Sequence, residues 1–228
     1  MLFNQNFIQT LPAQVRLSCG GIANTDVLKL ERVWHDNIME ATLTNCSGHA
    51  VRVREVALAY GAFPVAASCP FYAEGYHMLS QYGGTLKQPY NIGKYGPDKE
   101  FFKFDETVFN KDLFTVHNLL LLSPTQRARV LMAFSSCNKF LGEFRFRDSY
   151  IEIIMDTEDM LLESGESWAL EEFAFSTVRR GKDCLPGWPI ESQSIIHRLN
   201  IRKRRLAGAR TIVYAGLRRT LCMGRQKR

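Results

Sequence analysis

Two short stretches decide the fold: Phe144-Arg145-Phe146-Arg147 and, after three more residues, Ile151-Glu152-Ile153. In both, apolar and charged side chains alternate. Successive side chains of a β-strand point to opposite faces of the sheet, so this alternation places the phenylalanines and isoleucines on one buried face and the charges in water. The two stretches therefore predict strands of a half-buried sheet.

Similar segments fill most of residues 1–177. Val51-Arg52-Val53-Arg54 alternates in the same way, and other segments are rich in β-branched and aromatic residues. These segments are Thr25–Val33, Ile38–Asn45, Val56–Tyr60, Phe101–Phe104, Phe114–Leu122, Arg129–Ser135 and Trp168–Phe175. Ser164-Gly165-Glu166 predicts a turn between two of the strands. No helical periodicity lasts for three turns, so the sequence predicts an all-β fold, a β-sandwich.

The stretch from Cys69 to Asp98 has a different composition. It is rich in Tyr and Gly and shows little periodicity. We expect it to be a long loop excursion from the sandwich, and long ordered loops often carry functional surface.

The bulk composition is that of a globular protein. The 228 residues are 46% hydrophobic and 23% charged, and the apolar runs fall short of the ~20 residues that a membrane helix needs. The first residues lack a basic segment followed by an apolar one, so we expect no secretory signal. The six cysteines show no disulfide framework. They predict free buried thiols and a cytoplasmic protein with no membrane partner.

The net charge of +6 hides two regions of opposite sign. Residues 178–228 hold 14 of the 29 Lys and Arg but only two acidic residues, a net of +12, which leaves −6 for residues 1–177. All 15 Phe lie in residues 1–177. We therefore expect a β-sandwich domain over residues 1–177 and a basic, poorly ordered tail over residues 178–228.

Several motifs, in order, resemble the N-terminal domain of family-36 glycoside hydrolases, the α-galactosidases (melibiases) and their raffinose-synthase-like relatives. The first is Glu74-Gly75-Tyr76-His77-Met78-Leu79-Ser80-Gln81, followed by Gly83-Gly84-Thr85-Leu86. The others are Val116–Leu121, Phe134–Gly142 and Leu161–Glu166. The resemblance covers roughly residues 20–177 and implies a supersandwich-like domain packed on a catalytic TIM barrel.

In this family the barrel holds the two catalytic aspartates. The resemblance therefore implies a chain truncated before its catalytic barrel, with no catalytic residue, no metal and no cofactor of its own. The implied partners are the missing barrel and, as a further possibility, other copies of the chain. An α-galactoside substrate is implied only for the intact enzyme.

The tail has an explanation in the genetic code. Read in the neighbouring frame, the codons of Arg205 to Val213 are compatible with Pro-Gly-Trp-Cys-Ser-Tyr-Tyr-Cys, which resembles the segment where the family's barrel begins. We therefore hypothesise a frameshift near Ser176–Asp183. A sequence not selected to fold has no patterned apolar face to offset its conformational entropy.

Candidate binding residues lie in the aromatic stretch. They are Tyr72, Glu74, Tyr76 and His77. Glu74 and His77 are candidates for a general acid and base, whereas their match to a non-catalytic domain argues against that role. The tyrosines, with Tyr82 and Tyr90, either stack on a sugar or pack the loop against the barrel, and the second is favoured.

Other patterns favour structural roles. Cys46-Ser47-Gly48-His49 has the spacing of metal ligands but no second pair, so a turn with a buried thiol is favoured over a zinc site. Trp34 and Trp168 are expected in the core. The acidic residues Glu152, Asp156, Glu158 and Asp159 are expected at a solvated strand edge and turn.

Two further functions remain open. A free-standing sandwich would bind carbohydrate without cleaving it. The alternative of nucleic-acid binding rests only on the basic tail and its Arg202-Lys203-Arg204-Arg205 run. If the tail is read in a shifted frame, this basic run is accidental. We therefore expect no nucleic-acid partner.

Overall fold

The computed structural model describes residues 4–75, 81–91, 113–126 and 128–179. Within these ranges the fold is nearly all β, as the sequence predicts. It also contains one short helix, α1 (Gln5–Thr10), which was not predicted. Among the described residues, no helix is long and apolar enough to cross a bilayer. The predicted strand Phe101–Phe104 and the residues beyond Arg179, including Arg202–Arg205, lie outside the described residues.

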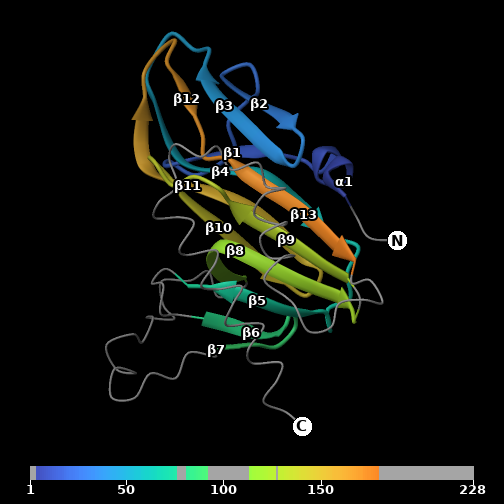
Figure 1. The fold of residues 1–228 in the computed structure, drawn as a ribbon. Helices are drawn as coiled ribbons and strands as arrows, with labels where there is room; N and C mark the ends of the chain where they lie inside the picture. Colours follow the sequence, from blue (N-terminus) through green and yellow to red (C-terminus); the bar gives the residue numbers. More distant parts are fainter. Residues whose placement is uncertain (1–3, 76–80, 92–112, 127, 180–228) are drawn as a thin grey trace.

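The strands make up one antiparallel sheet. They are β1 (Gln14–Leu17), β2 (Leu28–His35), β3 (Ile38–Asn45), β4 (Val51–Ala62), β5 (Pro70–Glu74), β6 (Gln81–Thr85), β7 (Pro89–Asn91), β8 (Phe114–Thr125), β9 (Ala128–Phe134), β10 (Leu141–Arg147), β11 (Tyr150–Leu162), β12 (Ser167–Ala169) and β13 (Phe173–Arg179). Their order is β1-β4-β11-β10-β8-β9-β13-β3-β12, with β2 paired to β3 and β5 paired to both β8 and β6. Figure 1 shows β2, β3 and β12 at one end of the molecule and β5, β6 and β7 at the other.

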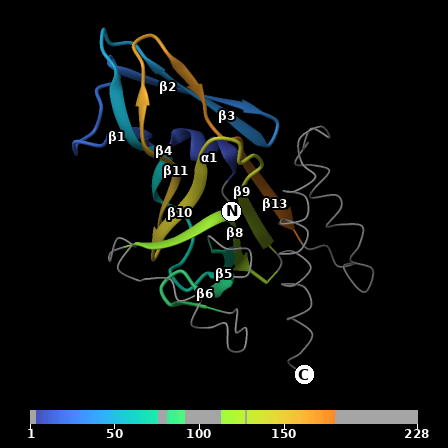
Figure 2. The same ribbon diagram turned by 90° about the vertical axis from the view of Figure 1, so that its left-hand side faces the viewer.

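The sheet bends until it nearly closes on itself. β1 is one end of the strand order, yet it contacts β2, which pairs with β3 near the other end. Figure 2 shows this bend from the side. Helix α1 lies against the inner face of the bent sheet, where Ile8 joins the core. The inner face holds the main hydrophobic core, which includes Ile8 of α1 and Trp168. Trp34 is partly buried and packs against that core.

The alternation in the two fold-deciding stretches produces this core. Phe144 pairs in register with Ile153 and Phe146 with Ile151, and the exposed fraction of these four side chains is 0–1%. Burying each such side chain stabilises the fold by about 1.5–3 kcal/mol. The predicted apolar face is therefore confirmed.

Two predicted elements are wrong in their details. The described part of Cys69–Asp98 contains the strands β5, β6 and β7 rather than a loop. Glycines hide its alternation, because Gly83 and Gly84 occupy strand positions opposite Tyr72 and Phe71 without contributing a side chain to the pattern. The predicted strand Trp168–Phe175 is two strands, β12 and β13. The chain leaves the sheet between them, where Glu171 hydrogen-bonds the 136–140 loop.

The prediction of buried thiols is mostly wrong. All four described cysteines are free, but only Cys69 is buried, whereas Cys19, Cys46 and Cys137 are exposed. These three lie in turns and connections rather than on the inner face of a strand. Cys184 and Cys222 lie outside the described residues.

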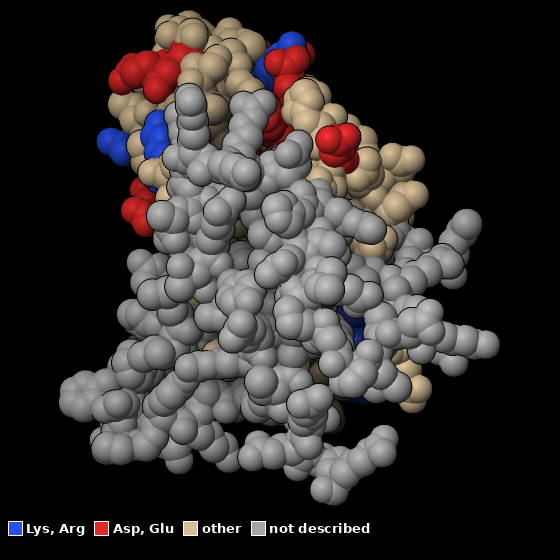
Figure 3. Space-filling view, in the orientation of Figure 1, with Lys and Arg blue, Asp and Glu red and all other residues tan. Residues whose placement is uncertain are grey.

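Charges of both signs are interspersed on the surface that Figure 3 shows. Basic and acidic side chains lie close together at the end that carries β2, β3 and β12. On the part of this end that is in view and described, neither sign forms a continuous field.

Candidate functional site

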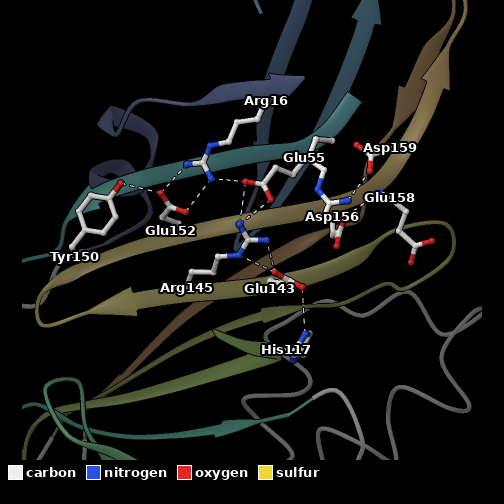
Figure 4. A network of polar contacts seen from close by, with 11 residues as sticks. Arg16, Glu55, His117, Glu143, Arg145, Tyr150, Glu152, Asp156, Glu158 and Asp159 are labelled. Carbon is white, nitrogen blue, oxygen red and sulfur yellow. Dashed lines mark hydrogen bonds and ion pairs between the residues drawn. The ribbon is translucent and has the colours of Figure 1, made fainter. Parts of the chain in front are cut away.

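A line of charged side chains crosses five neighbouring strands on the outer face of the sheet. Its members, here called the charged row, are Arg16 of β1, Glu55 of β4, Glu152 of β11, Arg145 and Glu143 of β10, and His117 of β8. Figure 4 shows them as one connected network. Within the described part of the chain, it is the most extensive set of buried ion pairs.

The two arginines each join two carboxylates. Arg16 binds Glu55 and lies 2.8 Å from Glu152, measured from Nη2 to Oε1. Arg145 binds Glu55 with 2.8 Å between Nη1 and Oε2, and Glu143 with 2.8 Å between Nη2 and Oε2. Arg16 and Arg145 therefore meet at the carboxylate of Glu55.

The ends of the row are tied by a tyrosine and a histidine. The hydroxyl of Tyr150 donates to Glu152 Oε1 over 3.0 Å. At the other end, His117 Nε2 lies 3.3 Å from Glu143 Oε1. Each of the three carboxylates thus has two side-chain partners.

Strand register builds this arrangement. Arg16 lies directly opposite Glu55, and Glu143 lies directly opposite His117. Arg145 lies opposite Glu152. Directly opposite residues of antiparallel strands have Cβ atoms about 4.5–5.5 Å apart, so opposite charges there attract one another.

The sequence-based prediction that the alternating charges lie in water is wrong for Glu152 and Arg145, whereas it is confirmed for Arg52, Arg54 and Arg147, which are exposed. In the row, Glu55, Glu143 and Glu152 are only 4–6% exposed. For Glu152 this also corrects its assignment to a solvated edge, whereas Glu158 is exposed as expected. Charges on neighbouring strands compensate one another, which allows the row to be buried. One sequence signal could have predicted this burial. Arg145 and Glu152 have opposite charges, and a hairpin between their two strands places them opposite each other.

Burial and pairing act in opposite directions on the pKa values of Glu143 and Arg145. Burial alone would raise the pKa of Glu143, but hydrogen bonding to His117 and the charges of Arg145 and His117 lower it. Burial alone would lower the pKa of Arg145, but the charges and hydrogen bonds of Glu143 and Glu55 raise it. The carboxylate of Glu143 and the guanidinium of Arg145 are therefore held in their ionised forms near neutral pH.

An apolar cluster adjoins the charged row on the same outer face. Along β8 the outward positions change from polar to apolar at Asn118, whose φ of 60° marks an irregularity in the strand. The cluster, here called the outer apolar cluster, consists of Ile38, Tyr72, Leu119, Leu121, Leu131, Ala133 and Ala174. All of its members are 9% exposed or less. The outer face is therefore apolar over one half and ionic over the other.

Two of the four candidate binding residues reach this face. Tyr72 belongs to the outer apolar cluster, and Glu74 is paired in register with His117. Glu74 is 5% exposed, and burial raises its pKa to about 7. Tyr76 and His77 lie outside the described residues, so the proposed pairing of Glu74 with His77 stays a prediction. Of the other tyrosines, Tyr82 is buried and Tyr90 is exposed.

The candidate metal motif is an exposed turn. Cys46 is exposed, which corrects the predicted buried thiol, and the Asn45 amide donates to the carbonyl of His49 over 2.8 Å. In the described ranges, no group of three His, Cys, Asp or Glu side chains is arranged to hold a metal ion.

The arrangement of the row disfavours acid–base catalysis. Glu74 and Glu143 have pKa values shifted in opposite directions, a pattern typical of an acid and a base. However, the oxygens of Glu143 are already bound by Arg145 and His117. A retaining glycosidase needs one free nucleophilic carboxylate about 5–5.5 Å from its acid. The described carboxylates of the row are committed to other partners.

Comparisons with known proteins give similarities of fold. No protein-family model and no curated protein matches the chain. The α-galactosidase from Lactobacillus brevis is similar with a TM-score of 0.45 and 10% identity, over 83% of this chain and 31% of that one. Two family-36 α-galactosidases of Geobacillus stearothermophilus, a variant of AgaA with 1-deoxygalactonojirimycin and AgaB, give TM-scores of 0.43 and 0.41 at 10% and 12% identity. Each similarity covers 74% of this chain and 30% of the other. The chain spans about a third of the length of these structures.

Proposed function

We propose that the chain is the non-catalytic N-terminal domain of an α-galactosidase-like family-36 glycoside hydrolase, and that its outer face packs against the catalytic barrel. The activity of the intact enzyme would be hydrolysis of terminal α-galactosides such as melibiose or raffinose. The motifs between Glu74 and Glu166 occur in the same order as in family-36 enzymes, which supports the assignment to this family.

The composition of the outer face carries this proposal. Glu55, Glu143 and Glu152 are each bound by two side chains, and the outer apolar cluster lies beside them. A catalytic centre needs accessible groups that are free to react with a substrate. A packing surface instead combines apolar side chains with charges that are neutralised in place. The outer face has the second character.

The proposal places the barrel in a shifted reading frame. A frameshift near Ser176–Asp183 would put residues 178–228 out of register with the barrel's coding sequence. We further propose a cytoplasmic location, and contacts between copies of the intact enzyme.

Sequencing the gene and its downstream region tests this directly. We expect the adjacent frame to continue from Gly-Trp-Cys-Ser-Tyr-Tyr-Cys into a complete barrel with its two aspartates. An unbroken frame that ends at Arg228, with no barrel encoded after it, would overturn the proposal.

A second candidate function is carbohydrate binding by a free-standing sandwich. The observation that favours it is an open pocket, lined by several amide and hydroxyl side chains, between α1, the β2–β3 turn and β13, away from the charged row. Absence of a downstream barrel together with sugar binding would favour this second function over the first.

A further inference from the structure

An open pocket of about 480 Å³ lies where α1 meets the end of β13. The side chains that matter for its chemistry are Gln5, Asn6, Asp36, Asn37, Ser176 and Thr177. In the strand order β13 and β3 follow β9, on the side away from β10 and the rest of the charged row. The pocket is open to solvent, so a ligand bound there would stay partly exposed.

The pocket has a defined framework. Asp36 and Asn37 form the two-residue turn between β2 and β3, with Asp36 at a φ of 55°. The carbonyl of Asn37 accepts from the backbone N–H of Phe175 over 2.8 Å, which joins the turn to β13. On the other side, the Asn4 side chain accepts from the N–H of Phe7 over 3.1 Å and fixes the start of α1.

The side-chain amide of Asn37 is the unusual group. Both Oδ1 and Nδ2 are buried, and neither has a hydrogen-bond partner in the described structure. Leaving such groups unpaired is unfavourable, and most buried polar atoms in proteins are paired. Turning the amide toward the pocket would break no hydrogen bond, and a ligand there would then satisfy it.

The remaining side chains restrict the class of ligand. No lysine or arginine is among the described residues that line the pocket, and Asp36 adds a negative charge, so a phosphate or carboxylate would be repelled. The amides of Gln5, Asn6 and Asn37 each offer a donor and an acceptor, and the hydroxyls of Ser176 and Thr177 offer both as well. Groups that donate and accept side by side match the hydroxyls of a sugar.

We propose that this pocket binds a neutral, hydroxyl-rich ligand of the hexose class, and that the amide of Asn37 hydrogen-bonds its hydroxyls. The proposal takes from the second candidate function only its sugar binding, and it does not require the sandwich to be free-standing. A barrel found downstream would therefore leave it standing, and a failure to bind sugar would leave the first function standing.

Titration of the full chain with D-galactose and with raffinose, followed by ligand-observed NMR and calorimetry, tests the proposal. We expect saturable binding of at least one sugar and none of inorganic phosphate. In Asn37→Ala the Kd should rise about tenfold, as expected for the loss of a hydrogen-bonding amide. The matched control is Asn138→Ala, an exposed asparagine in the 136–140 loop, which should bind like the wild type.

A thermal melt separates binding from folding. Because the Asn37 amide makes no hydrogen bond, Asn37→Ala should melt at or above the temperature of the wild type while it binds sugar more weakly. If this variant does not fold, Gln5→Ala provides the same comparison from α1. Absence of saturable sugar binding, preferential binding of phosphate, or wild-type affinity in the folded variants would each overturn the proposal.

Discussion

At the scale of single residues, Glu171 holds together a part of the fold that lies outside the sheet ladder. Its Oε1 accepts from three consecutive backbone N–H groups, those of Asn138, Lys139 and Phe140, at 2.7–3.1 Å. Its Oε2 accepts from the hydroxyl of Ser136. Glu171 is 2% exposed. Its carboxylate therefore accepts the hydrogen bonds that water would otherwise accept from the backbone N–H groups of this loop.

Substitution Glu171→Ala should destabilise the protein by about 3 kcal/mol or more, because it leaves several buried donors unpaired. Urea denaturation monitored by tryptophan fluorescence measures this, since Trp168 packs on Phe140 of the same loop. Glu163→Ala, at an exposed position, is the control and should stay near the wild type. Equal stability of the two variants would show that the carboxylate is dispensable.

Glu74 predicts a pH dependence of stability. Its pKa is raised by burial from an ordinary 4.5 to about 7 in the folded protein. A carboxyl whose pKa is higher in the folded than in the unfolded state favours folding while it is protonated. Its contribution is therefore complete below pH 4.5 and is lost as the pH rises to about 7.

Glu74→Gln removes this titration, because the amide stays neutral at every pH. Relative to the wild type, the variant should gain stability as the pH rises from 4.5 to 7, by at most about 3 kcal/mol. Urea denaturation of both proteins at several pH values gives the difference. A difference that stays constant over this range would contradict the raised pKa.

At the scale of elements, β10 contributes to both faces of the sheet. Phe144 and Phe146 lie in the core, while Glu143 and Arg145 belong to the charged row. Both stretches that decide the fold were recognisable from their alternation, and the strand Ile38–Asn45 was predicted with its observed bounds. The row itself was missed because alternation shows which positions share a face but not what else covers that face.

Substitution Arg145→Met should destabilise the protein by about 3 kcal/mol, because it leaves the buried carboxylates of Glu143 and Glu55 without their shared cation. The matched control is Arg54→Met. Arg54 pairs with Asp159 over 2.8 Å, but both side chains are largely exposed and solvent screens the pair. We expect a far smaller change in the control, measured by chemical denaturation. Similar losses in both variants would show that burial gives the row no special role.

The Tyr- and Gly-rich region shows where sequence patterns fail at this scale. β5, β6 and β7 are three to five residues long, too short to display a clear period. Glycine removes the side chain that would reveal the face. Likewise, the pocket beside α1 brings together residues about 140 positions apart, Asn37 and Thr177, and no local signal could predict that contact.

At the scale of the whole molecule, the fold consists of one sheet with two differently built faces. The inner face is a continuous core, and the outer face combines the charged row with the outer apolar cluster. The all-β class follows from patterning alone. The near closure of the sheet depends on the pairing of strands distant in sequence, such as β4 with β11, which composition and period do not determine.

A fragment of residues 1–179 should be prone to aggregate when expressed alone. The outer apolar cluster is 9% exposed or less in the full chain. We expect the shorter fragment to uncover it, and exposed apolar patches favour association. Light scattering during expression and concentration measures this, and Leu121→Ser within the cluster should reduce it. A monodisperse fragment that melts cooperatively would argue against a missing partner surface.

The central claim is that this chain supports glycoside hydrolysis but does not perform it. The most direct test is an assay of the purified, folded protein with a chromogenic α-galactoside between pH 4 and 8. The account predicts a rate equal to that of the buffer blank, with Glu143→Gln and Glu74→Gln indistinguishable from the wild type. Turnover that saturates with substrate and disappears in either variant would contradict it.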